Sequence, residues 1–184
     1  FMASDYYLDR LGEDAEDVRW SVMAEDESST EESPRYGSCL KYSLGDKGST
    51  TAVNIKVIRL SEIYLIAAEA ALLSSTPDKD KAVAYLNEIR KRAPNLEPAT
   101  TATITLDMIL DEKSKELFAE GHRYFDMLRT NQEITFNDDF IEGGITISTR
   151  DVTIDRTFYK CILPISQDEI NANPAIEAQQ NPGY

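Results

Sequence analysis

The stretch KVIRLSEIYLIAAEAALLS, residues 56–74, decides the fold of this chain. Its apolar side chains recur every three to four residues, which is the spacing of one face of an α-helix. The face is wide, and the alanines within it allow a second helix to approach closely. We therefore expect a helix over 56–74 that packs against other helices through Val57, Leu60, Ile63, Tyr64, Ala67, Ala68, Ala71 and Leu72.

A second amphipathic pattern follows after a short polar loop. Thr76 is expected as the N-cap and Pro77 as a first-turn residue of a helix over 77–92, with basic residues in its last turn. The helix, loop and helix of residues 61–95 resemble a tetratricopeptide unit, whose period is about 34 residues. One such unit cannot bury its own apolar face, so we expect it to stack on neighbouring helices.

Another pair of helices is expected further along the chain. Thr105 would cap a helix over 106–119, and Gly121 would interrupt it before a helical segment over 122–130. After this pair the period of the apolar residues changes from that of a helix to that of a strand.

The remaining segments complete the predicted organisation. Residues 1–55 are expected to form an N-terminal helical and loop segment with an acidic loop, and 56–184 the main region. The expected fold class is mainly α, with tetratricopeptide-like helix pairs, a small β-hairpin and an irregular C-terminal tail. Within 56–184 the predicted parts are helix pairs at 56–93 and 105–130, the hairpin at 140–163 and the tail at 164–184.

The charge of the chain excludes some classes of partner. The 184 residues carry 33 acidic and 19 basic side chains, a formal charge of -14. Nucleic acids and anionic lipid surfaces are bound through clustered Lys and Arg, so neither is expected as a partner. Residues 1–33 hold eleven acidic and two basic side chains, a net charge of -9. The acidic excess is therefore concentrated near the N-terminus.

The ends of the chain and its two cysteines bear on export, membrane insertion and the state of the thiols. No basic segment followed by an apolar one marks an export signal, and no stretch is apolar enough to span a membrane. Because Phe1 lies inside an amphipathic segment, we expect a piece of a longer protein. Cys39 and Cys161 match no metal or redox spacing, so we expect two lone buried thiols.

Few residues carry the patterns of catalysis or metal binding. His122 is the only imidazole, and Glu120 would point about 200° away from it on a helix, so they do not converge on one ion. Nucleophile elbows, phosphate loops and dinucleotide-binding glycines are absent from the sequence. We expect no catalytic residue, no metal and no cofactor. Glu62 and Glu69 lie in an apolar helix and are expected to form ties to arginines of other helices.

Three aromatic side chains could form a platform for a sugar ring. Trp20, Tyr6 and Tyr7 lie outside the expected helix faces, and sugar sites combine an apolar surface with nearby polar groups. The alternative is that Trp20 covers the underlying helices as part of the core.

Four blocks of the sequence resemble the C-terminal half of the SusD/RagB family. The resemblance covers most of residues 15–184, and its closing block is the most specific. Weaker similarity upstream includes Asp17 and Arg19 in the family's D-x-R segment, and Lys41 with Tyr42 in its K-Y segment. The four blocks are VIRLSEIYLIAAEA (57–70), AVAYLNEIRKRA (82–93), LDEKSKELFAEGHRYFDMLRT (110–130) and LPISQDEINANPAIEAQQNPGY (163–184).

The resemblance implies a class of function. Such proteins are SusD-like lipoproteins of the outer membrane that face the cell surface and serve nutrient uptake and polysaccharide utilisation. They bind oligosaccharides or other nutrients without catalysis, and they cover a TonB-dependent, SusC-like transporter. The lipidated cysteine and export signal would lie upstream of Phe1. The matching blocks are expected to be scaffold, with Arg59, Glu62, Glu69, Arg123, Asp126 and the closing NPGY holding helices together.

Two other functions stay open at this stage. Paired carboxylates could hydrolyse a glycosidic bond, although pairs arise easily among so many acidic residues. A helical-repeat adaptor could instead bind peptides on its concave face.

Overall fold

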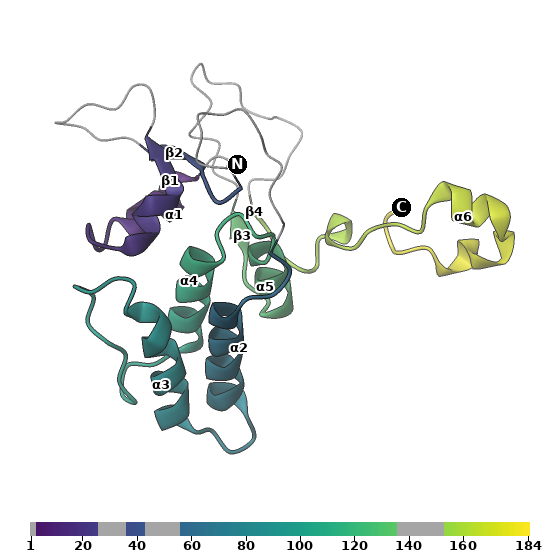
Figure 1. The fold of residues 1–184 in the computed structure, drawn as a ribbon. Coiled ribbons are helices and arrows are strands. Elements are labelled where there is room, and N and C mark those ends of the chain that lie inside the picture. Colours follow the sequence, from purple (N-terminus) through teal and green to yellow (C-terminus); the bar gives the residue numbers. More distant parts are fainter. Residues whose placement is uncertain (1–2, 26–35, 43–55, 136–152) are drawn as a thin grey trace. The chain divides into compact units, whose positions relative to one another are not determined.

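The computed structural model describes residues 3–25, 36–42, 56–135 and 153–184 (Figure 1). The chain divides into two compact units, Phe1–Arg123 (unit 1) and Tyr124–Tyr184 (unit 2). The described elements are mostly helical, which confirms the mainly α fold class. Within the described ranges, every helix is too short or too polar to cross a lipid bilayer.

Three helices form the main core of unit 1. Helix α2 (Leu60–Leu73) packs against α3 (Lys79–Arg90), and α4 (Leu106–Glu116) packs against both, as Figure 1 shows. The predicted tetratricopeptide-like pairing of the first two helices is therefore confirmed. Their shared core consists of Leu65, Ala68, Ala82, Leu86, Ile89, Ala99, Ile104 and Ile109.

The predicted inward face of α2 is only partly right. Leu65 and Ala68 are fully buried, whereas Val57, Leu60 and Ile63 are 80%, 70% and 47% exposed. Because α2 is apolar around most of its circumference, periodicity alone could not select the side that packs on its neighbours.

The N-cap of α3 differs from the prediction, and that of α4 agrees with it. Asp78 accepts a hydrogen bond from the backbone N–H of Lys81 at 3.0 Å, so α3 starts two residues after Pro77. A carboxylate is a strong N-cap acceptor, and the prediction of Thr76 was wrong. Thr105 caps α4 by accepting from the N–H of Met108 at 3.1 Å.

Helix α4 ends earlier than its apolar pattern indicated. Its last residue is Glu116 rather than residue 119. Ala119 and Gly121 both have positive φ, at 62° and 81°, which no helix can continue through. This turn brings Phe118 and Glu120 beside the end of α4.

A smaller cluster holds the N-terminal elements of unit 1. Helix α1 (Asp5–Leu11) is followed by the short 3₁₀ helix η1 (Val18–Val22) and by strand β1 (Met23–Glu25). Strand β1 pairs antiparallel with β2 (Tyr36–Cys39). Buried Ala3, Tyr7, Leu11 and Met23 form the cluster, with Leu8, Trp20 and Phe118 packed against it.

The described residues of unit 2 form a short strand pair and several short helices. Strand β3 (Ile134–Thr135) pairs antiparallel with β4 (Thr153–Ile154). The predicted hairpin at 140–163 thus has its second strand near the expected place, but residues 140–152 lie outside the described residues. The helices are α5 (Arg123–Arg129), η2 (Tyr159–Cys161), α6 (Gln167–Ala172) and η3 (Pro174–Gln179).

Two other predictions concern the cysteines and the domain boundary. Cys39 and Cys161 are free thiols, each half-buried rather than fully buried. The predicted domain boundary after residue 55 falls beside a stretch outside the described residues, and it stays a prediction.

Candidate functional site

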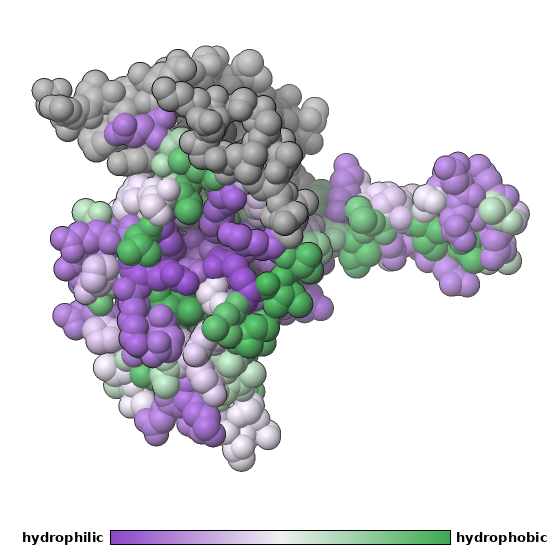
Figure 2. Space-filling model, viewed as in Figure 1, coloured by the Kyte–Doolittle hydropathy of each residue, from purple (hydrophilic) through white to green (hydrophobic). Residues whose placement is uncertain are grey.

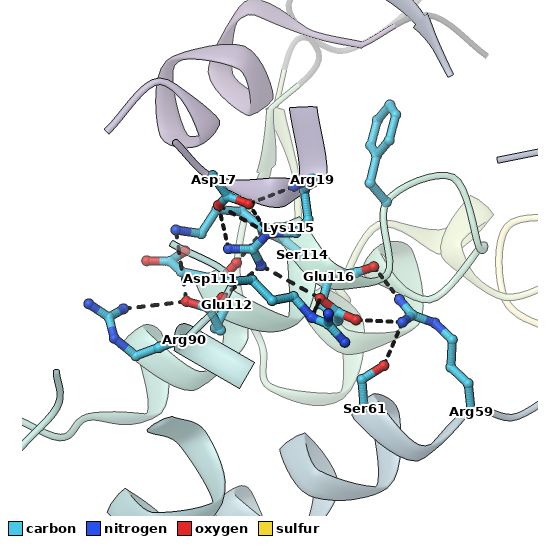
Figure 3. A network of polar contacts seen from close by, with 12 residues as sticks. Asp17, Arg19, Arg59, Ser61, Arg90, Asp111, Glu112, Ser114, Lys115 and Glu116 are labelled. Carbon is cyan, nitrogen blue, oxygen red and sulfur yellow. Dashed lines mark hydrogen bonds and ion pairs between the residues drawn. The ribbon is translucent and has the colours of Figure 1, made fainter. Parts of the chain in front are cut away.

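A charged ridge on α4 is the most distinctive feature of unit 1 (Figure 3). Glu112, Glu116 and Glu120 follow one another at intervals of four residues, so the two within α4 lie on one helix face. Burying a charge is costly unless an opposite charge and hydrogen bonds compensate it. The buried charged residues of α4 are Glu112, Lys113, Lys115 and Glu116.

The D-x-R segment supplies the first partner of this ridge. Asp17 accepts from the backbone N–H of Arg19 at 2.9 Å, and its carboxylate also accepts from Nε and Nη2 of that guanidinium, at 2.8 and 2.6 Å. Arg19 Nη1 then donates to Glu112 Oε1 at 2.7 Å. Burial by itself would lower the pKa of Arg19, but the contacts with Asp17 and Glu112 raise it, so the side chain stays cationic. The segment therefore ties η1 to α4.

Arg59 meets the other end of the ridge from the residue before α2. Its Nε and Nη2 donate to the two carboxylate oxygens of Glu120, each at 2.9 Å. The same guanidinium binds the carboxylate and the backbone carbonyl of Glu116, and it donates to Ser61 Oγ at 2.5 Å. Arg59 thus connects the N-terminal end of α2 to the C-terminal end of α4.

Lys41 completes the cap of α4. Its ammonium donates to the carbonyls of Glu116 and Phe118, at 2.9 and 3.0 Å, and to Glu120 Oε1 at 2.7 Å. A cation at this position satisfies helix carbonyls that have no intrahelical partner. Burial alone would raise the pKa of Glu120, but hydrogen bonds from Arg59 and Lys41 lower it. Burial lowers the pKa of Lys41 itself.

The end of α3 and the turn after it contribute two more cations, Arg90 and Arg92. Arg90 Nη1 donates to Glu112 Oε2 at 3.4 Å, and Arg92 Nε lies 2.7 Å from Glu116 Oε2. Each carboxylate of the ridge therefore has at least two basic partners. We call this set the ion network; its members are Asp17, Arg19, Lys41, Arg59, Arg90, Arg92, Glu112, Glu116 and Glu120.

The ion network is suited to bracing helices rather than to acid–base chemistry. A general acid in a glycosidase needs a raised pKa, and the pKa of Glu120 is lowered. The signal that could have found the network is the Glu–x₃–Glu–x₃–Glu spacing. Its partner in the D-x-R segment lies 93 residues from Glu112, beyond any local pattern.

Asp14 joins the N-terminal elements to the turn that follows α3. Its carboxylate accepts from the backbone N–H and the side-chain Nδ2 of Asn95, at 2.8 and 2.9 Å. Burial alone would raise the pKa of Asp14, but these hydrogen bonds lower it. The Asp14 carbonyl also accepts from Trp20 Nε1 at 3.3 Å.

The three aromatic residues predicted as a sugar platform lie in different surroundings. Tyr7 is buried, and its ring stacks on Phe118 with 3.9 Å between the centroids. Trp20 is half-buried against the small N-terminal cluster. Tyr6 is 48% exposed, and its hydroxyl accepts from Arg10 Nη1 at 2.6 Å. A platform made by these residues stays a prediction, and Tyr6 is the ring that solvent reaches most.

The remaining predicted residues have structural contacts. His122 Nδ1 lies 3.6 Å from Glu62 Oε1, and within the described ranges no group of three or more His, Cys, Asp or Glu is arranged to hold a metal ion. Arg123 donates to the carbonyl of Leu110 at 3.4 Å. Asp126 accepts from Arg129 Nε at 2.8 Å within α5. The predicted tie of Glu62 to an arginine is replaced by its contact with His122.

The closing QNPGY sequence folds back on an earlier segment of unit 2. Gln180 Oε1 accepts from the N–H of Ile165 at 2.8 Å, and Nε2 of the same side chain donates to the Ile165 carbonyl at 3.0 Å. Asn181 Nδ2 donates to the carbonyl of Leu163 at 2.5 Å. The side-chain amides of Gln180 and Asn181 thus bind the backbone of the earlier segment, as a neighbouring strand would do with its own backbone.

The last two residues close the same contact. Tyr184 Oη donates to the carbonyl of Ile162 at 2.9 Å, and its ring meets the ring of Tyr159 edge to face, with centroids 5.4 Å apart. Gly183 has φ +94°, and a Cβ there would lie 2.6 Å from Tyr159 Cδ2. We call Gln180, Asn181, Gly183 and Tyr184, with Tyr159–Ile165 beneath them, the tail clasp.

Together, the helix pair, the ion network and the tail clasp define a helical-repeat scaffold whose specific sequence blocks serve to join segments. The model of the SusD family matches residues 9–184, and the chain belongs to that family. The blocks that resembled the family in sequence therefore have visible structural roles.

Relatives of known sequence and structure agree with this assignment. SusD-like protein P38 of Formosa agariphila is 28% identical over 141 residues, covering 71% of this chain and 25% of that protein. A SusD superfamily protein of Bacteroides vulgatus ATCC 8482 is 37% identical with a TM-score of 0.78, and one of Bacteroides thetaiotaomicron VPI-5482 is 35% identical with a TM-score of 0.80. A further structure from the same Bacteroides vulgatus strain, also at 37% and 0.78, bears the name of a candidate sugar-binding protein.

The match covers nearly all of this chain and less than half of each relative. The three solved structures are matched over 98% of this chain and over 39% to 40% of their own length. The chain thus spans about two fifths of those structures and a quarter of the curated relative.

Proposed function

We propose that this chain belongs to a non-catalytic binding protein of the cell surface that captures oligosaccharides for nutrient uptake. In this proposal the whole protein is anchored to the outer membrane by lipid and hands its ligand to a TonB-dependent, SusC-like transporter. Membership of the SusD family across residues 9–184 is the observation that carries it.

The electrostatics of unit 1 support binding over hydrolysis. The carboxylates of the ion network are paired with arginine and lysine side chains. A glycosidase needs one carboxyl group that holds its proton near neutral pH, beside a second that does not. Burial alone would raise the pKa of Glu120, but hydrogen bonds from Arg59 and Lys41 lower it, which is the opposite of what a general acid requires.

Binding and product formation can be measured on the same samples. The chain would be applied to an array of neutral and uronate oligosaccharides, and the ligands it retains would then be incubated with it and separated by chromatography. We expect saturable binding and an unchanged ligand. Hydrolysis that disappears when one carboxylate is replaced would overturn the proposal in favour of a glycoside hydrolase.

The transporter step has a separate test. The lipidated whole protein would be expressed beside its SusC-like transporter and purified through an affinity tag on the transporter. We expect the two to be isolated together. Isolation of the tagged transporter without the binding protein would contradict the hand-off, while leaving sugar capture in place.

A further inference from the structure

Tyr6 and Arg10 of α1 meet Asp111 of α4 at the surface of unit 1. Arg10 Nη1 donates to Tyr6 Oη at 2.6 Å, and its Nη2 binds Asp111 Oδ2. The guanidinium carbon lies 5.2 Å from the centroid of the Tyr6 ring. Because Arg10 and Asp111 are each about three quarters buried, they hold the exposed tyrosine in one orientation.

Hydrogen-bonding capacity is left over at this cluster. The Tyr6 oxygen accepts from Arg10, so its own hydroxyl proton can still be donated. Asp111 binds Arg10 through Oδ2, and its other oxygen accepts no hydrogen bond from the described residues. The cluster therefore offers an open aromatic ring, one donor and one acceptor.

This set of groups matches the chemistry of a sugar ring. A pyranose has an apolar face of C–H bonds that stacks on an aromatic ring, and an edge of hydroxyls that donate and accept hydrogen bonds. A ring already fixed in position loses less conformational freedom when a ligand binds to it. The Arg10 guanidinium is already paired with Asp111 and so offers no free cation to an anionic sugar, and the net charge of -14 disfavours such a ligand.

We infer that Tyr6, Arg10 and Asp111 form a subsite for one neutral pyranose unit of an oligosaccharide. The inference rests on the proposed function and narrows its ligand class to uncharged sugars. Tyr6 supplies the stacking surface and the hydroxyl donor, Asp111 supplies the acceptor, and Arg10 positions both.

Calorimetry with four neutral probes and one charged probe tests the subsite. The neutral probes are cellohexaose, maltohexaose, xylohexaose and mannohexaose, and the charged probe is hexagalacturonate. We expect at least one neutral hexaose to bind and hexagalacturonate not to bind. Tyr6→Ala removes the ring and should weaken binding about tenfold, whereas Tyr6→Phe keeps the ring and should weaken it about threefold.

Lys91→Ala is the matched control. Lys91 forms an exposed ion pair with Glu88 on α3, away from the cluster, and its loss should leave affinity unchanged. Thermal unfolding of each variant shows whether a loss of affinity reflects a loss of fold.

The outcomes separate the subsite from the proposed function. Neutral binding that survives both Tyr6 variants overturns the subsite and leaves sugar capture standing. Stronger binding of hexagalacturonate than of the neutral hexaoses would overturn the inferred preference for uncharged sugars. If the wild-type chain binds none of these probes and nothing on the array, sugar capture by this chain fails, and the subsite fails with it.

Discussion

In unit 1, Arg19 reaches Glu112 across 93 residues of sequence through a pair of opposite charges, and both side chains are buried. In unit 2, Tyr184 reaches Ile162 across 22 residues through a neutral hydroxyl that is partly exposed. Both contacts join segments of specific sequence, but by different chemistry. In the ion network each buried charge is compensated by others, so losing one group leaves its partners with fewer opposite charges. In the tail clasp each bond is neutral and can be lost by itself.

Both units expose apolar side chains, among them Leu60 in unit 1 and Leu163 in unit 2. Figure 2 shows hydrophilic and hydrophobic residues side by side on the face that it presents. Within the tail, Ile162 and Leu163 are exposed on the segment that the clasp holds. The polar contacts of the clasp are made by backbone groups, side-chain amides and the Tyr184 hydroxyl, while Ile162 and Leu163 stay exposed.

Among the changes that compare the ion network with the tail clasp, replacing Glu112 should cause the largest loss of stability. Glu112→Ala removes one of the three carboxylates that pair with buried Arg19, and we expect the free energy of unfolding of unit 1 to fall by about 3–5 kcal/mol. Urea unfolding followed by the fluorescence of Trp20 measures it, because Trp20 is the only tryptophan and lies in unit 1.

Glu88→Ala is the control for that change. Its ion pair with Lys91 is exposed, so its loss should cost less than about 1 kcal/mol. Equal effects of the two substitutions would contradict the distinction between a buried network and surface pairs.

The next effect in size concerns Gly183 of the tail clasp. Gly183→Ala places a Cβ against the Tyr159 ring and imposes a left-handed backbone on alanine, which costs about 1–2 kcal/mol before the clash is counted. Hydrogen exchange at residues 159–184 should become faster, while the unfolding of unit 1 is unchanged.

Gly121→Ala separates the two contributions. Gly121 also has a positive φ, at +81°, but a Cβ there meets no atom within 4 Å. We expect the backbone cost alone at this position. If both alanine variants destabilise their surroundings equally, the contact with Tyr159 contributes nothing.

Acidic pH should distinguish the two regions without any substitution. The pKa of Glu120 and of Asp14 is lower in the folded chain than the usual 4.5 and 3.8. A carboxyl group of this kind stabilises the fold above its unfolded pKa, and the contribution is lost as the pH falls through the folded value. Burial raises the pKa of Asp111, which acts in the opposite direction.

We therefore expect unit 1 to lose stability as the pH falls below about 4.5. Trp20 fluorescence in urea at a series of pH values measures this. The clasp contacts contain no carboxylate, so hydrogen exchange at 159–184, corrected for its intrinsic pH dependence, should show no matching loss. Parallel loss in both regions would contradict this assignment of charges.

Local patterns predicted the helices well because helix formation and capping depend on near neighbours. Thr105 was found from its place before an apolar period, and the two helices of the first pair from their spacing. Asp78 was missed because two cap candidates stood within three residues of one another, and the stronger acceptor prevailed.

Contacts between distant segments could not be predicted in the same way. The i, i+4 glutamates indicate a charged ridge, but only the fold shows that Arg19 and Arg59 reach it. Tyr6 and Tyr7 are adjacent in sequence, and their difference in burial depends on where Phe118 lies. The same limit applied to α2, whose apolar surface extends to both sides.

The smallest predicted effect tests whether the clasp is a sum of separate bonds. Tyr184→Phe removes the hydroxyl that donates to Ile162 and keeps the ring beside Tyr159, so the clasp should weaken by about 1 kcal/mol. Hydrogen exchange at 159–184 should then be about fivefold faster, with unit 1 unaffected. Tyr85→Phe is the control, because the Tyr85 hydroxyl makes no hydrogen bond with the described residues and its half-buried ring packs against the core of unit 1. A loss as large as that from Gly183→Ala would mean that the clasp opens as one cooperative element, and its neutral bonds would then be coupled like the charges of the ion network.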